Sequence, residues 1–172
     1  MYMESFATES PTSIETFVSK GDTYVVVGNS FNGISDSSRS KLYLFAENAS
    51  TKMMLQQDLI IPSVSVLHTL YDRGEIFLLA GTKFDSTSLS YKANSQIFHF
   101  NIVKGSLAPW QNFTTYGIVK VASFHAVNQG IFVALGHSVN HEDNSDEGFV
   151  SLHEFKDQML QSYLIEFIQM RG

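Results

Sequence analysis

The chain of 172 residues has no cysteine, which excludes a disulfide framework and a thiolate metal site. Basic residues are also few: 11 Lys and Arg stand against 17 Asp and Glu, and the longest basic cluster is the pair Arg39 and Lys41. A nucleic-acid-binding protein usually carries a basic patch, so we expect no nucleic-acid partner. Because no apolar stretch approaches the roughly 20 residues of a membrane helix, we expect no insertion into a membrane either.

What the chain does contain favours a folded β protein. Hydrophobic residues make up 44% and charged residues 16%, a balance that argues against a disordered chain. The 14 Phe and 7 Tyr favour strands, because aromatic side chains fit a pleated, half-buried surface.

Three tandem copies of one pattern of about 54 residues run through the sequence. Each copy opens with a large apolar residue, continues with an apolar run that ends in glycine, reaches a further apolar strand, and closes with an apolar residue followed by Gln. The recurring positions are Phe17, Leu70 and Phe124; Gly28, Gly81 and Gly136; Tyr43, Phe98 and Leu152; and the pairs Leu55-Gln56, Trp110-Gln111 and Leu160-Gln161. We place the copies at residues 4–57, 58–112 and 113–168.

Each copy divides into four short apolar runs separated by turn residues, which predicts a four-stranded antiparallel sheet. Glycine in the first turn, at Gly21, Gly74 and Gly130, supplies the positive φ that a tight hairpin demands. The second run is apolar at consecutive positions, as in a strand covered on both faces. We therefore predict an all-β fold of three four-stranded antiparallel blades of a β-propeller. The equivalent core residues are expected to be Phe17, Leu70 and Phe124, with Val26, Leu79 and Ala134 on the inner strands.

Several features of each copy together resemble one known family. They are the early Phe, the runs VVVGNS, LLAGTK and VALGHS, the aromatic strands KLYLF and QIFHF, and the closing apolar–Gln pair. This pattern resembles the epilepsy-associated repeat (EAR, also called EPTP) of leucine-rich glioma-inactivated proteins and related extracellular and adhesion-receptor proteins. The resemblance covers about residues 4–168. It implies a seven-bladed propeller that binds other extracellular proteins, so we expect a non-catalytic module for cell adhesion or receptor binding.

Only three copies are present, whereas a propeller closes a ring of typically four to eight blades. The outer faces of the first and last units are expected to expose apolar residues, namely Val25, Val27, Phe132 and Leu135. Two explanations are open: further blades come from a longer version of the same chain, or a second chain completes the ring. We expect the chain to be a fragment. The sequence MYMESFATES at the N-terminus has no basic region or apolar run, so it is not a signal peptide.

Enzyme signals are few. The segment GNSFN at 28–32 nearly matches the G-x-S-x-G nucleophile elbow but lacks its last glycine, and the elbow needs a strand-to-helix turn. We therefore expect neither catalytic residues nor a cofactor. A two-carboxylate glycosidase stays open as an alternative, because the sequence does not fix which acids face each other. The other alternative is an intracellular propeller scaffold.

The histidines and one acidic loop are the remaining candidates for chemistry. His99 and His153 are expected to be equivalent packing positions, because the first copy has Leu44 there. In the acidic loop HEDNSDEG, the candidates for Ca²⁺ are Asp143, Asn144 and Asp146, whose oxygens suit a hard cation. The spacing is not that of an EF-hand, and we expect a solvated loop without a metal.

Two N-x-S/T sequons make Asn48 and Asn112 candidates for glycosylation if the chain is secreted, and both are expected near turns. Each copy also carries a long polar loop before its third strand, among them NGISDSSRS and DSTSLSYKANS. Such loops suit a variable recognition surface on a rigid scaffold. From the resemblance we expect an extracellular or cell-surface location and a protein partner found there.

Overall fold

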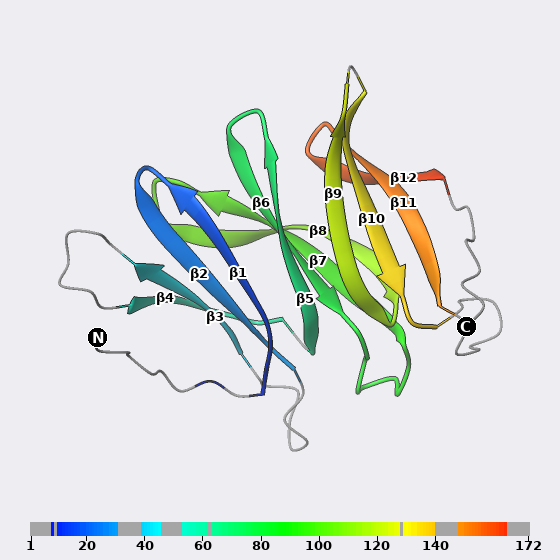
Figure 1. The fold of residues 1–172 in the computed structure, drawn as a ribbon. Coiled ribbons are helices and arrows are strands. Elements are labelled where there is room, and N and C mark those ends of the chain that lie inside the picture. The colour runs from blue at the N-terminus through cyan, green and yellow to red at the C-terminus, as the bar shows by residue number, and fades with distance from the viewer. Residues whose placement is uncertain are drawn as a thin grey trace, which may run out of the picture.

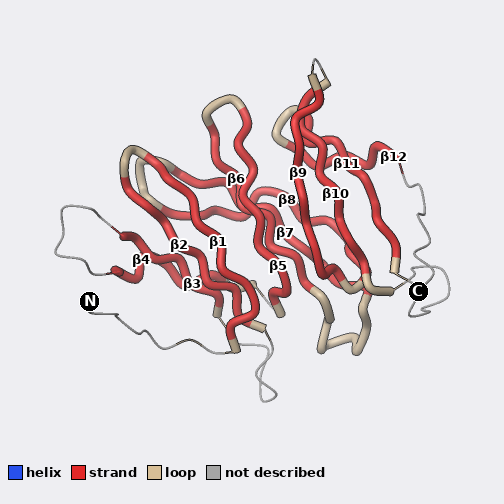
Figure 2. The backbone as a smooth tube through the Cα atoms, viewed as in Figure 1, coloured by secondary structure: helices blue, strands red, loops and turns tan. Residues whose placement is uncertain are grey.

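The computed structural model describes residues 8, 10–30, 39–45, 53–61, 63–127, 129–139 and 148–164. Residues 163 and 164 are described by their backbone alone. These residues form strands joined by turns (Figures 1 and 2). The first sheet contains β1 (Pro11–Ser19), β2 (Asp22–Asn29), β3 (Ser40–Phe45) and β4 (Met53–Leu59). The second contains β5 (Val64–Asp72), β6 (Glu75–Thr82), β7 (Lys92–Asn101) and β8 (Ser106–Tyr116). The third contains β9 (Ile118–Ala126), β10 (Gly130–His137), β11 (Phe149–Lys156) and β12 (Met159–Leu164).

Within each sheet the strands lie side by side in chain order, and every neighbouring pair is antiparallel. The prediction of an all-β fold with three four-stranded antiparallel sheets is therefore confirmed. The predicted glycine turns are also present. Lys20 and Gly21 have φ of 53° and 87°, and Arg73 and Gly74 have φ of 51° and 83°. Two successive positive φ values are the mark of the type I′ turn that joins twisted strands tightly.

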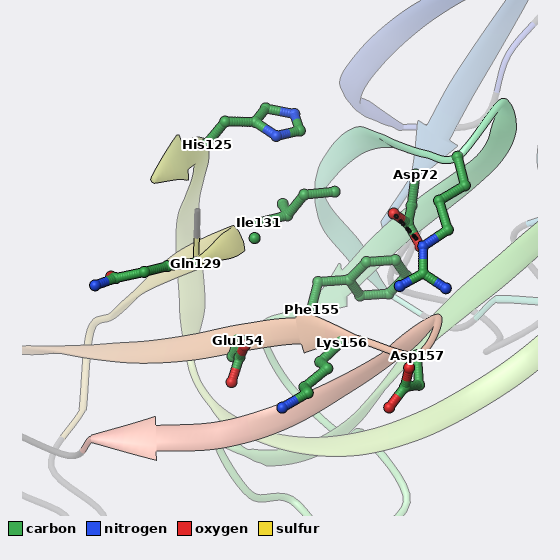
Figure 3. A pocket seen from close by; sticks show the side chains of 10 residues that line it. Asp72, His125, Gln129, Ile131, Glu154, Phe155, Lys156 and Asp157 are labelled. Carbon is green, nitrogen blue, oxygen red and sulfur yellow. Dashed lines mark ion pairs between the residues drawn. The ribbon is translucent and has the colours of Figure 1, made fainter. Parts of the chain in front are cut away.

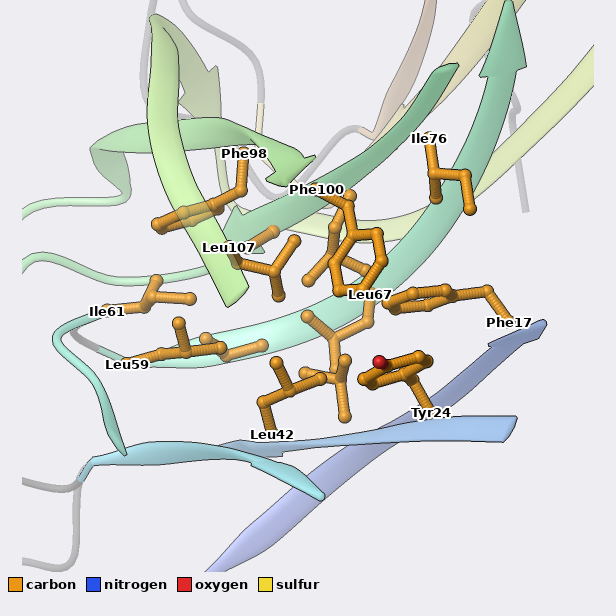
Figure 4. Close-up of a cluster of buried hydrophobic side chains, with 14 residues drawn as sticks. Phe17, Tyr24, Leu42, Leu59, Ile61, Leu67, Ile76, Phe98, Phe100 and Leu107 are labelled. Carbon is orange, nitrogen blue, oxygen red and sulfur yellow. The ribbon is translucent and has the colours of Figure 1, made fainter. Parts of the chain in front are cut away.

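The three sheets pack face to face in a row, with the second sheet between the other two (Figure 1). One apolar cluster fills the space between the first and second sheets, which we call the first joint (Figure 4). Phe17 and Tyr24 stack there at 5.2 Å, and both rings meet the edge of Phe100 from the second sheet. A second cluster fills the second joint, between the second and third sheets, where Phe77 meets Phe155 at 5.1 Å. The second strand of each sheet is apolar at consecutive positions because both of its faces are largely buried.

We call the face of a sheet that points toward the next sheet in the chain its forward face, and the opposite one its backward face. Phe17 and Leu70 lie on the forward faces of the first and second sheets and are 2% and 1% exposed, as predicted. Phe124 takes the same position in the third sheet but is 50% exposed, so its prediction as a core residue is wrong. The reason is that no sheet lies against the third forward face among the described residues.

The predicted register of the third copy is also wrong by one residue. Tyr43 and Phe98 pair with Val25 and Leu78, but the third sheet puts His153 at this position, opposite Val133. Leu152 instead pairs with Ala134. Since a shift of one residue moves a side chain to the other face, His153 points toward the second sheet, whereas His99 lies on a forward face. These two histidines are therefore not equivalent.

Other sequence predictions need correction. Val27, Phe132 and Leu135, expected to be exposed on the outer faces, are 1%, 4% and 1% exposed, and Leu135 packs into the second joint. The predicted limits at 57/58 and 112/113 fall inside β4 and β8, because these strands continue to Leu59 and Tyr116. The connection between β8 and β9 is Gly117 alone, at φ +60°, whereas residues 60–63 join β4 to β5.

Side chains of one sheet also bind the backbone of the next, and the two joints do this at matching positions. Gln57 of β4 donates to the Leu107 carbonyl at 2.9 Å and accepts from the Leu107 N–H at 2.8 Å. Gln111 of β8 makes the same two bonds to Leu160, at 2.9 and 2.8 Å. We call this pair of bonds the glutamine clasp. It satisfies backbone groups on the outer edge of the next sheet, which no neighbouring strand covers.

The first strands of the two sheets repeat the arrangement. The Thr12 hydroxyl donates to the Val64 carbonyl, and the equivalent Ser65 hydroxyl donates to the Ile118 carbonyl at 2.6 Å. Glu15 accepts from the Thr69 N–H at 2.9 Å in the first joint. Its equivalent in the second joint is a histidine, His68.

Candidate functional site

A cavity of about 430 Å³ opens where the second joint reaches one rim of the molecule (Figure 3). Its walls come from the turns of two sheets, because the β5–β6 and β9–β10 hairpins and the end of β11 meet there. The lining residues are Asp72, Arg73, His125, Gln129, Gly130, Ile131 and the run 154–157.

The cavity carries charges of both signs. Asp72 and Arg73 form an ion pair at 3.9 Å, in which the Arg73 side chain is 72% exposed. Glu154, Lys156 and Asp157 of the third sheet also line the cavity, although Glu154 lies beside Phe132 on the forward face of that sheet. An exposed pair of this kind contributes little to stability, so these side chains are available to bind charged groups of a partner.

A second, smaller cavity of about 170 Å³ in the same joint contains two linked imidazoles. The Tyr116 N–H donates to His137 Nδ1 at 3.2 Å, so the neutral His137 ring carries its proton on Nε2. That Nε2 lies 2.9 Å from Ser151 Oγ, which in turn lies 2.9 Å from His153 Nε2. Burial lowers the pKa of His153 and keeps it neutral.

A serine meets a histidine at two places in the second joint: in this His137–Ser151–His153 network, and between Ser123 and His68, where the hydroxyl oxygen lies 2.8 Å from Nε2. However, Ser151 and His137 are each only 5% exposed, and the flat face of His137 stacks on Phe149 at 4.3 Å. A substrate has little access to this hydroxyl. The three side chains therefore form a buried network in the joint, in which each polar group has a hydrogen-bond partner.

Two other histidines of the second joint, His68 and His99, also have bonded partners. His68, at the position of Glu15, has its Nε2 2.8 Å from Ser123 Oγ of the third sheet. Burial lowers the pKa of His68, against a smaller rise caused by Glu15. His99 Nε2 lies 2.8 Å from Glu75 Oε2 on the neighbouring strand. His125 lines the larger cavity.

The loop between β6 and β7, residues 83–91, is one of the long polar loops predicted before a third strand, and the structure describes all of it. Asp85 organises it: its Oδ1 accepts from the Thr87 N–H at 2.9 Å, and its Oδ2 accepts from the Ser88 hydroxyl at 2.8 Å. These bonds, led by the one from the Ser88 side chain, lower the pKa of Asp85. Backbone bonds between Asp85 and Ser90 in both directions, at 2.8 and 3.1 Å, close the loop.

The closed loop presents apolar side chains to solvent. Leu89, at its tip, is 78% exposed, and Tyr91 is 42% exposed while its ring meets Phe84 at 5.3 Å. The loop is anchored below, because the Gly117 N–H donates to the Tyr91 carbonyl at 2.8 Å. A preformed loop with an apolar tip loses little conformational freedom on binding.

The structure locates some of the other predicted site residues. Asn112 is exposed in the middle of β8, opposite Gln96, so its expected place near a turn is wrong. Gly28 and Asn29 of the GNSFN segment end β2, a strand that enters no helix in the described residues. Asn48 and the Ca²⁺ candidates Asp143, Asn144 and Asp146 lie outside the described residues.

No protein-family model matches the chain, and no curated protein matches it. In the described ranges, no helix is present that could span a lipid bilayer. Within the same ranges, no group of three or more His, Asp or Glu side chains lies close enough together to hold a metal ion. What the chain does therefore has to follow from its own geometry.

Proposed function

We propose that the chain is a non-catalytic protein-binding module whose three sheets are blades of a β-propeller of the EAR type. The observation that carries this proposal is the β6–β7 loop, which Asp85 holds in one shape while Leu89 stands 78% exposed at its tip. An apolar side chain that is displayed on a preformed loop suits the buried centre of a protein interface. The charged cavity of Figure 3 lies at the opposite rim from this loop and so belongs to a separate contact.

The serine–histidine contacts of the described residues lie between packed sheets, which supports a role without catalysis. Ser151 is sealed between two imidazoles, and the histidines at 68 and 99 are bonded to Ser123 and Glu75. Strands thus supply stability, and loops supply contacts.

The proposed partner is an extracellular or cell-surface protein, and the proposed role is adhesion or receptor binding. The sequence resemblance supports this, together with the exposed Asn112 in its sequon. Secretion of the chain behind an added signal peptide, followed by intact mass, tests the location. A glycan that disappears in Asn112→Gln is expected; an unmodified Asn112 favours the intracellular scaffold instead.

A carbohydrate-processing propeller is the second candidate, because carboxylates from two sheets line one cavity. Asp72 belongs to the second sheet, while Glu154 and Asp157 belong to the third (Figure 3). Two carboxyl groups at the right separation are what glycoside hydrolysis requires. Asp72 is, however, already paired with Arg73 at 3.9 Å. Release of sugar from a glycan panel, lost in Glu154→Gln, would favour this candidate.

Binding is tested by measuring the affinity of the immobilised chain for a panel of receptor ectodomains. The variant Leu89→Asp should weaken the best binder by at least tenfold, because it places a charge at the centre of the interface. The matched control is Val103→Asp, since Val103 is 89% exposed in the turn between β7 and β8 and outside the loop. Equal affinity of the two variants would contradict the role of the loop.

A further inference from the structure

The backward face of the first sheet carries the same receiving groups that accept a preceding sheet in both joints. Leu107 and Leu160, which accept the glutamine clasp, pair with Phe100 and Phe155. In the first sheet the corresponding pair is Met53 and Phe45. The Met53 backbone N–H and C=O therefore occupy the clasp-accepting position. Among the residues that the structure describes, no side chain binds them.

The side chains of this face match those of a receiving face as well. Ile14 takes the position of Leu67 and Val121, as the strand pairing shows. Leu67 is 4% exposed beneath the first sheet, whereas Ile14 is 64% exposed. Val18 of β1 and Leu55 of β4 add to the apolar surface, at 58% and 52% exposed. The face thus carries exposed apolar side chains on β1 and β4, beside the Met53 edge that no described side chain binds, whereas Val27 and Tyr43 in its central strands are buried.

We propose that this backward face is a docking surface for a further four-stranded antiparallel sheet whose outer strand presents a glutamine, which clasps the Met53 backbone. The proposal rests on the proposed nature of the sheets as propeller blades and names the chemistry of the sheet that would dock there. The two existing joints define that chemistry: a carboxamide on the fourth strand, a hydroxyl on the first, and an apolar centre.

The forward face of the third sheet does not have this chemistry, so a second copy of the chain is not the expected occupant. The position of Gln57 and Gln111 is taken by Leu164, and that of Thr12 and Ser65 by Val119. Ala122 stands where the first two sheets have Glu15 and His68. The side chains of these three residues have no hydrogen-bond donor or acceptor for the backbone of another sheet.

The test supplies such a sheet and asks whether it covers Ile14. In the extended chain, a copy of residues 8–61 replaces residues 1–7 of the full chain. This puts residues 60, 61 and 8–10 between the added β4 and the original β1, one residue more than the natural connection of 60–63. Since the chain has no cysteine, Ile14→Cys in the original first sheet provides a single thiol, whose alkylation rate reports its exposure.

We expect the added sheet to slow alkylation by at least about tenfold, as burial of the thiol requires. Gln57→Leu in the added copy alone should restore most of the alkylation rate of the unextended chain. Gln56→Leu in the added copy is the control, and it should leave the thiol protected. Thr16→Cys is a second thiol position on the same face and guards against a folding defect specific to position 14.

Two outcomes overturn the proposal. One is alkylation that the added sheet leaves unchanged or that Gln57→Leu does not restore. The other is protection of the thiol in the unextended chain that rises with concentration, because a second copy would then be the occupant. Affinity for a receptor ectodomain, measured on the same variants, reports the proposed function separately, since the β6–β7 loop lies outside this face.

Discussion

The forward faces of the second and third sheets are built from equivalent strands, but only the second is covered by another sheet. The difference shows which properties of a side chain depend on its own strand and which depend on the neighbouring sheet. Leu70 and Phe124 hold the same position, each opposite the aromatic ring of Phe77 or Phe132. Leu70 is 1% exposed because the third sheet covers it, and Phe124 is 50% exposed. Local sequence thus places a side chain on a face, but the next sheet decides whether that face becomes core.

The polar groups of the two faces differ in the same direction. Ser65, His68 and Gln111 of the second sheet all bind the third sheet. Their counterparts in the third sheet are Val119, Ala122 and Leu164. The forward face of the second sheet meets another sheet, so its polar side chains find hydrogen-bond partners there. The forward face of the third sheet has apolar residues at the same three positions, and these need no such partners.

The largest difference is expected from truncating the position that the two faces share. Leu70→Ala should lower the free energy of unfolding by about 2–5 kcal/mol, because it opens a cavity in a covered face. Phe124→Ala should cost about 1 kcal/mol or less, since half of the ring is already in water. Urea unfolding of both variants, followed by circular dichroism, measures this. Equal costs would mean that the third face is covered in solution.

Glycine at the end of the second strand offers a sharper comparison. A methyl group on Gly81 would come within 2.8 Å of Ile118 in the third sheet, whereas one on Gly136 meets nothing closer than Lys120 at 3.4 Å. Gly81→Ala should therefore destabilise by about 1–3 kcal/mol through overpacking. Gly136→Ala should be neutral or slightly stabilising, because it restricts the unfolded chain. A lower unfolding midpoint in Gly136→Ala would indicate an unseen neighbour.

The glutamine clasp is expected to contribute less than the core. Gln111→Leu leaves the N–H and C=O of Leu160 without their partner, at a cost of about 1–3 kcal/mol. Gln161→Leu is the matched control, because Gln161 is exposed on β12. Trp110, the single tryptophan, lies beside the clasp and donates to the Gln158 carbonyl at 2.7 Å, so its fluorescence reports on this joint. Equal loss in both variants would contradict the clasp.

The smallest expected effect is a dependence on pH that belongs to the second joint. Burial lowers the pKa of both His68 and His153 below the ordinary 6.5. Below pH 6.5 the unfolded chain therefore binds protons that the folded chain does not, and stability falls as the pH decreases toward the folded pKa. The unfolding midpoint should be lower at pH 5.5 than at pH 7.5, and the difference should shrink in His68→Gln. An unchanged difference would remove His68 as a cause.

The fold was predictable because its signals are local and repeat three times. Glycine turns and consecutive apolar runs gave the strands and their order correctly. The register of the third copy was predicted wrongly for two reasons. Its first hairpin turn has one more residue than the other two, and Gln161 follows an apolar residue as Gln111 does but lies at a different position in its strand. The true equivalents are Gln57 and Gln111, and their role depends on contacts about 50 residues away in sequence.

The candidate site was harder to predict than the fold. The polar loop at residues 85–95 was recognised from composition, but the bonds from Asp85 that shape it need the actual turn. The cavity of Figure 3 collects residues from three turns of two sheets, and no local pattern links them. Its charges become one site only after the sheets have packed.

The single residue between the second and third sheets has a mechanical consequence. Gly117 is tied on both sides, since its N–H donates to the Tyr91 carbonyl at 2.8 Å and its carbonyl accepts from the Ser138 N–H at 2.9 Å. A pull on the β6–β7 loop therefore passes directly into the third sheet, because this connection holds no slack. The connection between the first and second sheets, 60–63, is longer, and its Ile61 is buried in the first joint. Under load, the second and third sheets should therefore move as one body.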